Sequence, residues 1–366
     1  MGTGITSILL YTFPFREEWL GTVACILFAL NCCLFFNFII MCILRYMMYP
    51  ELWMLMLTHP TESMFLGTFP MGLATIINMM VLVLVPRSDD WVAWVTWGIW
   101  IFDAIVSVLT AVVIPYIVTA HANESPLQSM TAAWLLPIVA CVVAASSGAM
   151  VADVLPHIYC SYWTVLVSYM LWAIGVSLAL MVMTIYLQRI MLHGLPPQAA
   201  IGTVFLPIGP LGQGGFGISK LGVVSEILFE EIEALDHFVG RVFYDVGLFV
   251  ALMMWSFGLV WIFFAFAAFT RSERGAFNLG LWALTFPLGV FANCTVQLGD
   301  ELSSHFFWVV GMLITGIVCF NWLMVSCRTI KAVYNGTVFV SPAVKDYEAK
   351  QTEDTGRRSA TDSWTL

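Results

Sequence analysis

Long uninterrupted apolar runs are the feature of this sequence that most restricts its fold. Nine runs are each long enough for a membrane-spanning helix, which needs about 20 apolar residues. A soluble chain of this size has too little interior to bury so much apolar surface, whereas lipid accepts it. The sequence therefore predicts an all-α membrane protein. The predicted spans are approximately 20–44, 63–85, 91–117, 130–152, 160–187, 199–222, 241–270, 276–298 and 303–327.

A shorter apolar segment precedes these runs. Residues 1–13 end at Pro14 and are too few to cross a bilayer alone. Because Met1 resembles an internal residue of a motif, we expect that the natural chain begins upstream and that a truncated first helix brings the total to ten. In the numbering used below, this segment is the first span.

Composition excludes several classes of function. Only 10% of the residues are charged and 60% are apolar, and the net charge is −9 without any basic patch, which argues against a nucleic-acid partner. The nine cysteines form no metal-type CxxC pair, and no nucleophile–base pair or phosphate-binding loop is present. We therefore expect no metal, no cofactor and no enzymatic activity.

Lysine and arginine predict the orientation of the chain. Basic residues gather after even-numbered spans, whereas acidic residues dominate the opposite loops, including the predicted loop 226–236. Both termini are therefore expected in the cytosol, with residues 1–335 forming the transmembrane domain and 336–366 a disordered tail. The basic residues on the predicted cytosolic side are Arg45, Arg189, Arg271, Arg274, Arg328, Lys331, Lys345, Lys350, Arg357 and Arg358.

Proline recurs in alternate spans. Pro70, Pro137, Pro207 and Pro287 lie in the third, fifth, seventh and ninth spans, separated by 67, 70 and 80 residues, and glycine follows three of them two residues later. One helical hairpin fits this period, so the chain is predicted to contain five repeated hairpins.

The prolines also predict which helices lie inside. A proline within a helix removes a backbone donor and kinks the helix, and lipid tolerates the freed carbonyl only beside protein or water. Odd-numbered helices kinked at these prolines are therefore expected to surround a central pore, with unbroken even-numbered helices outside. The alternative is that Pro–Gly pairs merely allow close packing, although prolines in four alternate spans favour the pore.

Several motifs carry a resemblance to a known family. Together they resemble the sulfite-efflux members of the tellurite-resistance/dicarboxylate transporter family, which includes the plant slow anion channels. The resemblance covers roughly residues 1–335, and the stretch 207–215 is its most specific part. The motifs are Met1-Gly-Thr-Gly-Ile, Arg45-Tyr46, His59-Pro60, Phe69-Pro-Met-Gly, Pro207-Ile-Gly-Pro-Leu-Gly-Gln-Gly-Gly215 and Ala292-Asn-Cys.

This resemblance implies ten helices in five hairpins around a pore, one pore per protomer of a homotrimer. It also implies that a phenylalanine on the ninth helix, Phe286 here, plugs the pore. Phe69 occupies the equivalent position of the third span, so it is a second candidate for the gate.

The pore is expected to offer weak donors to an anion, because no lysine or arginine lies deep in any span. Phe286, Gly289, Asn293 and Gln297 share one helical face of the ninth span, which favours a pore lining over inter-helix bonding. For the other candidates, inter-helix hydrogen bonds are an equal alternative. The remaining candidate pore-lining residues are Thr3, Gly72, Thr75, Asn78, Ser147, Gly209 and Gln213.

Two intramembrane acids are candidates for titration. Asp245 lies one turn from Arg241, so a structural ion pair is the favoured interpretation. Asp103 has no obvious partner in the sequence, and it either titrates or bonds to a neighbouring helix.

The predicted function is export of sulfite or bisulfite by a multi-pass protein of the plasma membrane, with membrane lipids and a homotrimer as its partners. One alternative keeps the pore and changes the substrate to malate, another dicarboxylate, chloride or nitrate. Another is a membrane receptor or scaffold, which the repeated hairpins disfavour.

Overall fold

The structure is a computed structural model that describes residues 1–15, 17–121, 127–232, 237–272 and 278–336. Helices form nearly all of this part of the chain, and it contains no strand. The predicted tail, apart from its first residue, and several of the basic residues used to predict orientation lie outside the described residues.

Eight helical segments within the described ranges are long and apolar enough to cross a membrane. The predicted seventh span is not among them, since its helix α8 is rich in glycine and ends in acidic residues; α1 has only ten residues. A short helix after α2, α3 (Glu51–Thr58), was not predicted. The main helices are α1 (Gly2–Tyr11), α2 (Glu18–Met48), α4 (Thr68–Met79), α5 (Trp91–His121), α6 (Leu135–Ala152), α7 (Ile158–His193), α8 (Ile208–Ile232), α9 (His237–Arg271), α10 (Thr285–Glu301) and α11 (His305–Tyr334).

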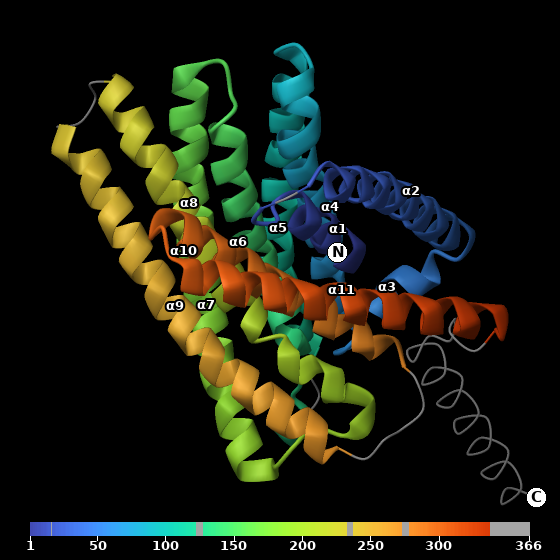
Figure 1. Ribbon diagram of the computed structural model, residues 1–366. Helices are drawn as coiled ribbons and strands as arrows, with labels where there is room; N and C mark the ends of the chain where they lie inside the picture. Colours follow the sequence, from blue (N-terminus) through green and yellow to red (C-terminus); the bar gives the residue numbers. More distant parts are fainter. Residues whose placement is uncertain (16, 122–126, 233–236, 273–277, 337–366) are drawn as a thin grey trace, which may run out of the picture.

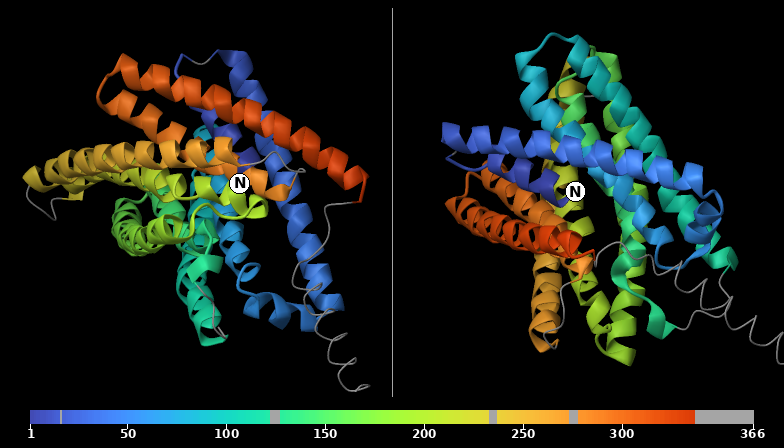
Figure 2. Two further views of the ribbon diagram at one scale, coloured as in Figure 1. Left: turned by 90° about the horizontal axis from the view of Figure 1, so that it is seen from below. Right: turned by 90° about the vertical axis from the view of Figure 1, so that its right-hand side faces the viewer.

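Burial alternates along the chain. In the most apolar stretch of the span that contains α6, 100% of the residues are buried, whereas the corresponding value is 11% for α2 and 22% for α11. The helices α4, α6, α8 and α10 and the short α1 form the interior, and α2, α5, α7, α9 and α11 lie on the outside (Figures 1 and 2). The expectation that odd-numbered spans lie inside thus agrees with the burial of these helices.

The five inner helices form a closed ring. Each packs against the next in the order α1, α4, α6, α8, α10, and α10 returns to α1, so the first and last of these five helices meet. Opposite members of the ring share no comparable contact among the described residues. Such an arrangement leaves a common axis that every inner helix faces with one side.

The prolines of the repeat lie at the starts of the inner α-helices rather than within them. Pro70, Pro137 and Pro287 are each the third residue of an α-helix, and Pro207 directly precedes α8. The first four amide groups of a helix have no intrahelical acceptor, so a proline there removes no hydrogen bond. A 3₁₀ segment precedes each of the four helices: η1 (Ser63–Gly67), η5 (Ala132–Trp134), η6 (Gln198–Phe205) and η7 (Leu279–Leu284).

A proline also lies inside one of the outer helices, which continues past it. Pro115 lies inside α5. Proline is tolerated within spanning helices where neighbouring groups satisfy the freed carbonyl. Proline position alone therefore does not separate inner from outer helices.

The glycine-rich run of α8 allows close approach by several neighbours. A Cβ added at Gly212 would lie 2.7 Å from the Cα of Phe291 in α10, and one at Gly217 would lie 3.0 Å from the Cβ of Ser146 in α6. Backbones this close exclude larger side chains. The run that carried the most specific part of the family resemblance therefore has a packing role.

Large apolar side chains cover the outward faces of the outer helices. Phe36 on α2, Met181 on α7, Phe263 on α9 and Phe320 on α11 are each more than half exposed. An apolar surface of this extent is unfavourable in water and suits the hydrocarbon of a bilayer. The protein is a multi-pass membrane protein.

Candidate functional site

Helix α8 presents one stripe to the axis of the ring. Gly212 faces α10 and Gly217 faces α6, so the surface between these two directions faces the axis. Gly209, Gln213, Phe216 and Lys220 occupy that surface at spacings of four, three and four residues; they are called the α8 stripe below.

Helix α10 presents a matching stripe. Gly289 packs on α1, since a Cβ there would lie 2.7 Å from Ile5, and Phe291 packs on the opposite side against α8. The surface between them faces the axis. It carries Phe286, Val290, Asn293 and Gln297, called the α10 stripe below.

Of the four residues predicted to share the pore-facing side of the ninth span, three lie on the α10 stripe. Phe286, Asn293 and Gln297 lie on the α10 stripe, whereas Gly289 lies at its edge. Gly289 instead allows α10 to pack closely on α1, because a side chain there would collide with Ile5. Small residues at such contacts are typical of helix packing in membranes.

A hollow lies in front of Gly209. The residue is buried, yet a Cβ added to it would meet no atom within 4 Å. Interiors are normally close-packed, so a buried position with this much room marks internal space. The ring therefore encloses a hollow at the start of the α8 stripe.

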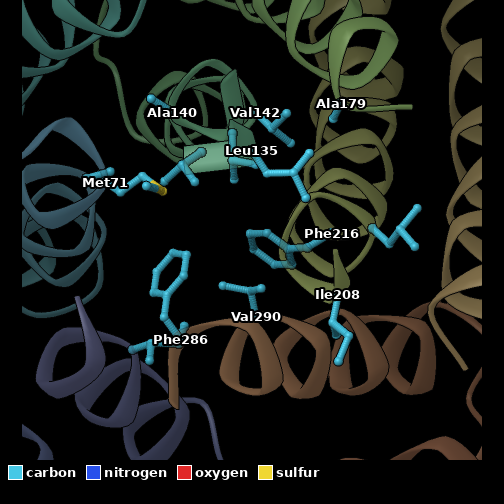
Figure 3. Packing of buried hydrophobic residues seen from close by; sticks show 14 of the residues in the cluster. Met71, Leu135, Ala140, Val142, Ala179, Ile208, Phe216, Phe286 and Val290 are labelled. Atoms are coloured by element: carbon cyan, nitrogen blue, oxygen red, sulfur yellow. The ribbon is translucent and has the colours of Figure 1, made fainter. Parts of the chain in front are cut away.

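Phe286 lies at nearly the same height along the ring axis as this hollow. Gly212 contacts Phe291 and Gly215 contacts Cys294, so α8 and α10 run in parallel with contacting residues 79 positions apart. This register brings Phe286 within about two residues, or roughly 3 Å, of the level of Gly209. Figure 3 shows the rings of Phe286 and Phe216 projecting from α10 and α8 into the space between the ring helices.

Uncharged polar groups lie on several ring helices. Asn78 shares a face of α4 with Met71, which Figure 3 shows pointing inward, and its Oδ1 is buried without a hydrogen-bond partner in the described chain. The hydroxyl of Ser147 on α6 is likewise buried and unpartnered there. Gln213 donates from Nε2 to the Ser146 hydroxyl. These amides and hydroxyls are weak, neutral donors and acceptors.

The two polar residues of the α10 stripe differ in their surroundings. Asn293 keeps 8% of its surface exposed although its helix is enclosed. Gln297 donates from Nε2 to the Glu301 carboxylate at 2.8 Å, near the end of the helix. Small residual exposure inside an enclosed helix is consistent with a neighbouring hollow.

Phe69 and Gly72 face the outer helix α2. The ring of Phe69 stacks on Phe35 of α2 with centroids 5.6 Å apart, and a Cβ at Gly72 would lie 3.2 Å from the same phenylalanine. Phe69 is therefore placed differently from Phe286, despite their equivalent positions in the repeat. Helix α4 packs against α2 along this face.

Thr75 and Thr3 also bond outward. The Thr75 hydroxyl accepts a bond of 3.2 Å from Nδ2 of Asn31 in α2. The Thr3 hydroxyl accepts one of 3.1 Å from the Trp322 indole in α11. For these two residues, inter-helix bonding, the alternative left open by the sequence, is what the structure contains.

The two intramembrane acids have different environments. Asp103 on α5 is fully buried, and neither carboxyl oxygen has a hydrogen-bond partner among the described residues. Asp245 on α9 is exposed and lies 3.6 Å from the Nε of Arg241, which also pairs with Glu226 at 2.8 Å. Asp245 therefore belongs to a surface ion-pair network.

Sequence reasoning missed Lys220 as a site residue. Its ammonium lies 2.8 Å from the Asp153 carboxylate, at the end of the α8 stripe. The spacing from Gly209 through Gln213 to Lys220 is helical and could have indicated a shared face. The described residues also contain no group of acidic, histidine and cysteine side chains fit to hold a metal.

Known proteins are similar to this chain over most of its length. Residues 1–330 match the voltage-dependent anion channel family, SLAC1. The sulfite efflux pump of Arthroderma otae is 48% identical over 331 residues, which cover 90% of this chain and 88% of that protein. The sulfite efflux pump of Candida albicans is 31% identical over 92% of this chain and 72% of its own length. The malic acid transport protein of Schizosaccharomyces pombe is 24% identical over 91% of this chain and 76% of its own length.

Proposed function

Because the chain belongs to the voltage-dependent anion channel family and is an anion transporter rather than an enzyme, we propose that it exports sulfite or bisulfite across the plasma membrane. The relatives of highest identity named above are sulfite efflux pumps. The family match over residues 1–330 includes every ring helix. The proposed path follows the ring axis along the α8 and α10 stripes.

The composition of these stripes is the observation that carries the proposal. Gln213, Asn293 and Gln297 supply amides and no stripe residue before Lys220 is charged. A permeating anion needs enough interaction to replace part of its hydration, but a strong cationic site would hold it too long. Neutral amides meet both requirements for a small oxyanion.

The proposed gate is the ring of Phe286. It is an apolar group at the level of the hollow beside Gly209, where glycine leaves room for a change of rotamer. An aromatic ring in a narrow path excludes water and so blocks an ion. Phe69 is left out of this gate because its ring stacks on Phe35 of the outer helix α2.

The proposal includes the membrane arrangement. Ten helices in five hairpins, a homotrimer in contact with membrane lipids, and cytosolic termini all follow from the family resemblance and the distribution of lysine and arginine. The described structure supports the hairpin arrangement through its alternation of inner and outer helices.

Efflux of radiolabelled sulfite from proteoliposomes that contain the purified protein tests the substrate. Protein-dependent release without a pH gradient indicates a channel, and release that requires a gradient indicates a coupled carrier. Absence of release above that of protein-free liposomes, while chloride or nitrate is released, would refute sulfite as the substrate.

Malate is the second candidate substrate, because a malic acid transport protein is among the relatives. A dicarboxylate carries two charged groups and favours paired cationic side chains, which the α8 and α10 stripes do not offer. Unlabelled malate should therefore compete poorly with sulfite in the same assay. Efficient competition would favour the dicarboxylate instead.

A further inference from the structure

We propose that Lys220 forms an anion-binding site at the acidic end of the path, with Asp153 as a counterion that the anion displaces. The acidic end is the end of the ring that carries Asp153, Glu226, Asp245 and Glu301. This inference rests on the proposed path, and it adds a charged site at the end of the α8 stripe, beyond the neutral amides.

The position of Lys220 on the path follows from helix geometry. It lies eleven residues after Gly209 and seven after Gln213, so all three share the side of α8 between its contacts with α10 and α6. The register of α8 with α10 puts Lys220 about level with Gln297. An anion that moves along the two stripes therefore meets the ammonium after the last amide.

The pairing of Lys220 suits an exchangeable site. Its ammonium lies 2.8 Å from Asp153, and the two side chains are 22% and 40% exposed. Ion pairs with this much water contact are weak, because hydration competes with the attraction. An arriving anion can thus replace the carboxylate, and the flexible lysine stem can follow it.

The charges around the site explain why a lysine is useful there. Glu226 is paired with Arg241, and Glu301 accepts hydrogen bonds from Tyr244 and Gln297. Carboxylates at this end repel an anion that leaves the path. A local positive charge offsets that repulsion at the point where the amides end.

Anion flux through reconstituted Lys220→Gln and Asp153→Asn proteins tests this site. Lys220→Gln is expected to lower the flux about two- to fivefold at low ionic strength, and Asp153→Asn to raise it, because it frees the ammonium. Both differences should shrink at high ionic strength, since salt screens exposed charges. A Lys220→Arg protein, which keeps the charge, should stay near the parent.

Arg241→Gln is the matched control. It breaks an exposed ion pair of the same length, 2.8 Å to Glu226, at the same end but on the outer helix α9. Its flux should change much less than that of Lys220→Gln, because Arg241 lies on the outer helix and outside both stripes. Melting temperatures of all the variants separate folding defects from transport defects.

Opposite effects of the two substitutions would support the site, because loss of a purely structural pair moves flux in the same direction from either side. Equal losses, no change, or effects independent of salt would overturn it. The assay is run with sulfite and with chloride. A parent protein that carries only chloride refutes the proposed substrate, while the comparison of variants still tests Lys220.

Discussion

Replacement of Phe286 by alanine tests both the gate and the path. The side chain is 7% exposed and begins the α10 stripe, level with the hollow beside Gly209. If the ring closes the path, its removal opens a passage that water can fill. We expect Phe286→Ala to raise anion flux at least about tenfold, equal to about 1.4 kcal/mol of barrier. Phe286→Leu, which keeps an apolar plug, should change flux less.

The same substitution has a distinct signature in stability. Truncation of a phenylalanine packed on all sides costs about 3–5 kcal/mol, because it leaves a cavity. A ring that already borders a hollow leaves less new cavity surface, so we expect a smaller loss for Phe286→Ala. Thermal unfolding in detergent, monitored by the fluorescence of the tryptophans, measures this loss.

Phe291 is the matched control on the same helix. It is fully buried, stacks on Trp255 with centroids 5.9 Å apart, and contacts Gly212 of α8, away from the axis. Phe291→Ala should therefore destabilise the protein more than Phe286→Ala and leave flux unchanged in the molecules that fold.

Flux is measured in proteoliposomes under the same anion gradient for every variant, and it is normalised to the amount of folded protein. The gate is refuted if folded Phe286→Ala protein conducts no more than the parent and loses as much stability as Phe291→Ala, because the ring is then an ordinary core residue. A specific loss of flux would instead mean that the ring positions the substrate.

Three further predictions follow from the structure and the proposed function. Gly209→Ala should fold as the parent does, and Gly209→Leu should reduce flux by filling the hollow. Gly212→Ala should lower the free energy of unfolding by about 1–3 kcal/mol, because its Cβ would lie 2.7 Å from the Phe291 backbone. Thermal unfolding and flux separate these outcomes, and a Gly209→Leu protein with parental flux would contradict the path. An epitope inserted after Ile232, between α8 and α9, should bind antibody on intact cells, and labelling only after permeabilisation would reverse the proposed orientation. Cells that lack the protein should accumulate sulfite and grow poorly in its presence, and unchanged intracellular sulfite in a strain without paralogues would count against sulfite export.

The hydropathy of neighbouring residues made the membrane helices predictable. The predictions and the structure differ at three places. The predicted seventh span is less apolar than the rest, because α8 uses glycine and polar residues to pack inside the ring. The predicted loop after this span is helical as far as Ile232, so acidic residues alone did not mark its end. Helix α3 was missed because eight residues between two predicted spans have too little pattern to stand out.

The candidate site was only partly predictable, because sequence spacing defines a face of one helix but not what that face meets. Spacing in the ninth span grouped Phe286, Asn293 and Gln297, which lie on the α10 stripe, and it missed Lys220, which has the same periodicity with Gly209. The repeat made Phe69 equivalent to Phe286, yet Phe69 stacks on Phe35 from an outer helix. Equivalent positions in a repeat can therefore have different neighbours.

The sequence by itself determined that this chain is helical, spans a membrane and alternates two kinds of helix, because hydropathy and proline positions act over a few neighbouring residues. Only the tertiary structure decided that α10 closes a ring against α1, that Gly209 borders a hollow while Gly289 packs on Ile5, and that Lys220 meets Asp153. These features depend on contacts between segments distant in the chain. Burial, pairing and empty space are properties of such contacts, and no single stretch of sequence contains them.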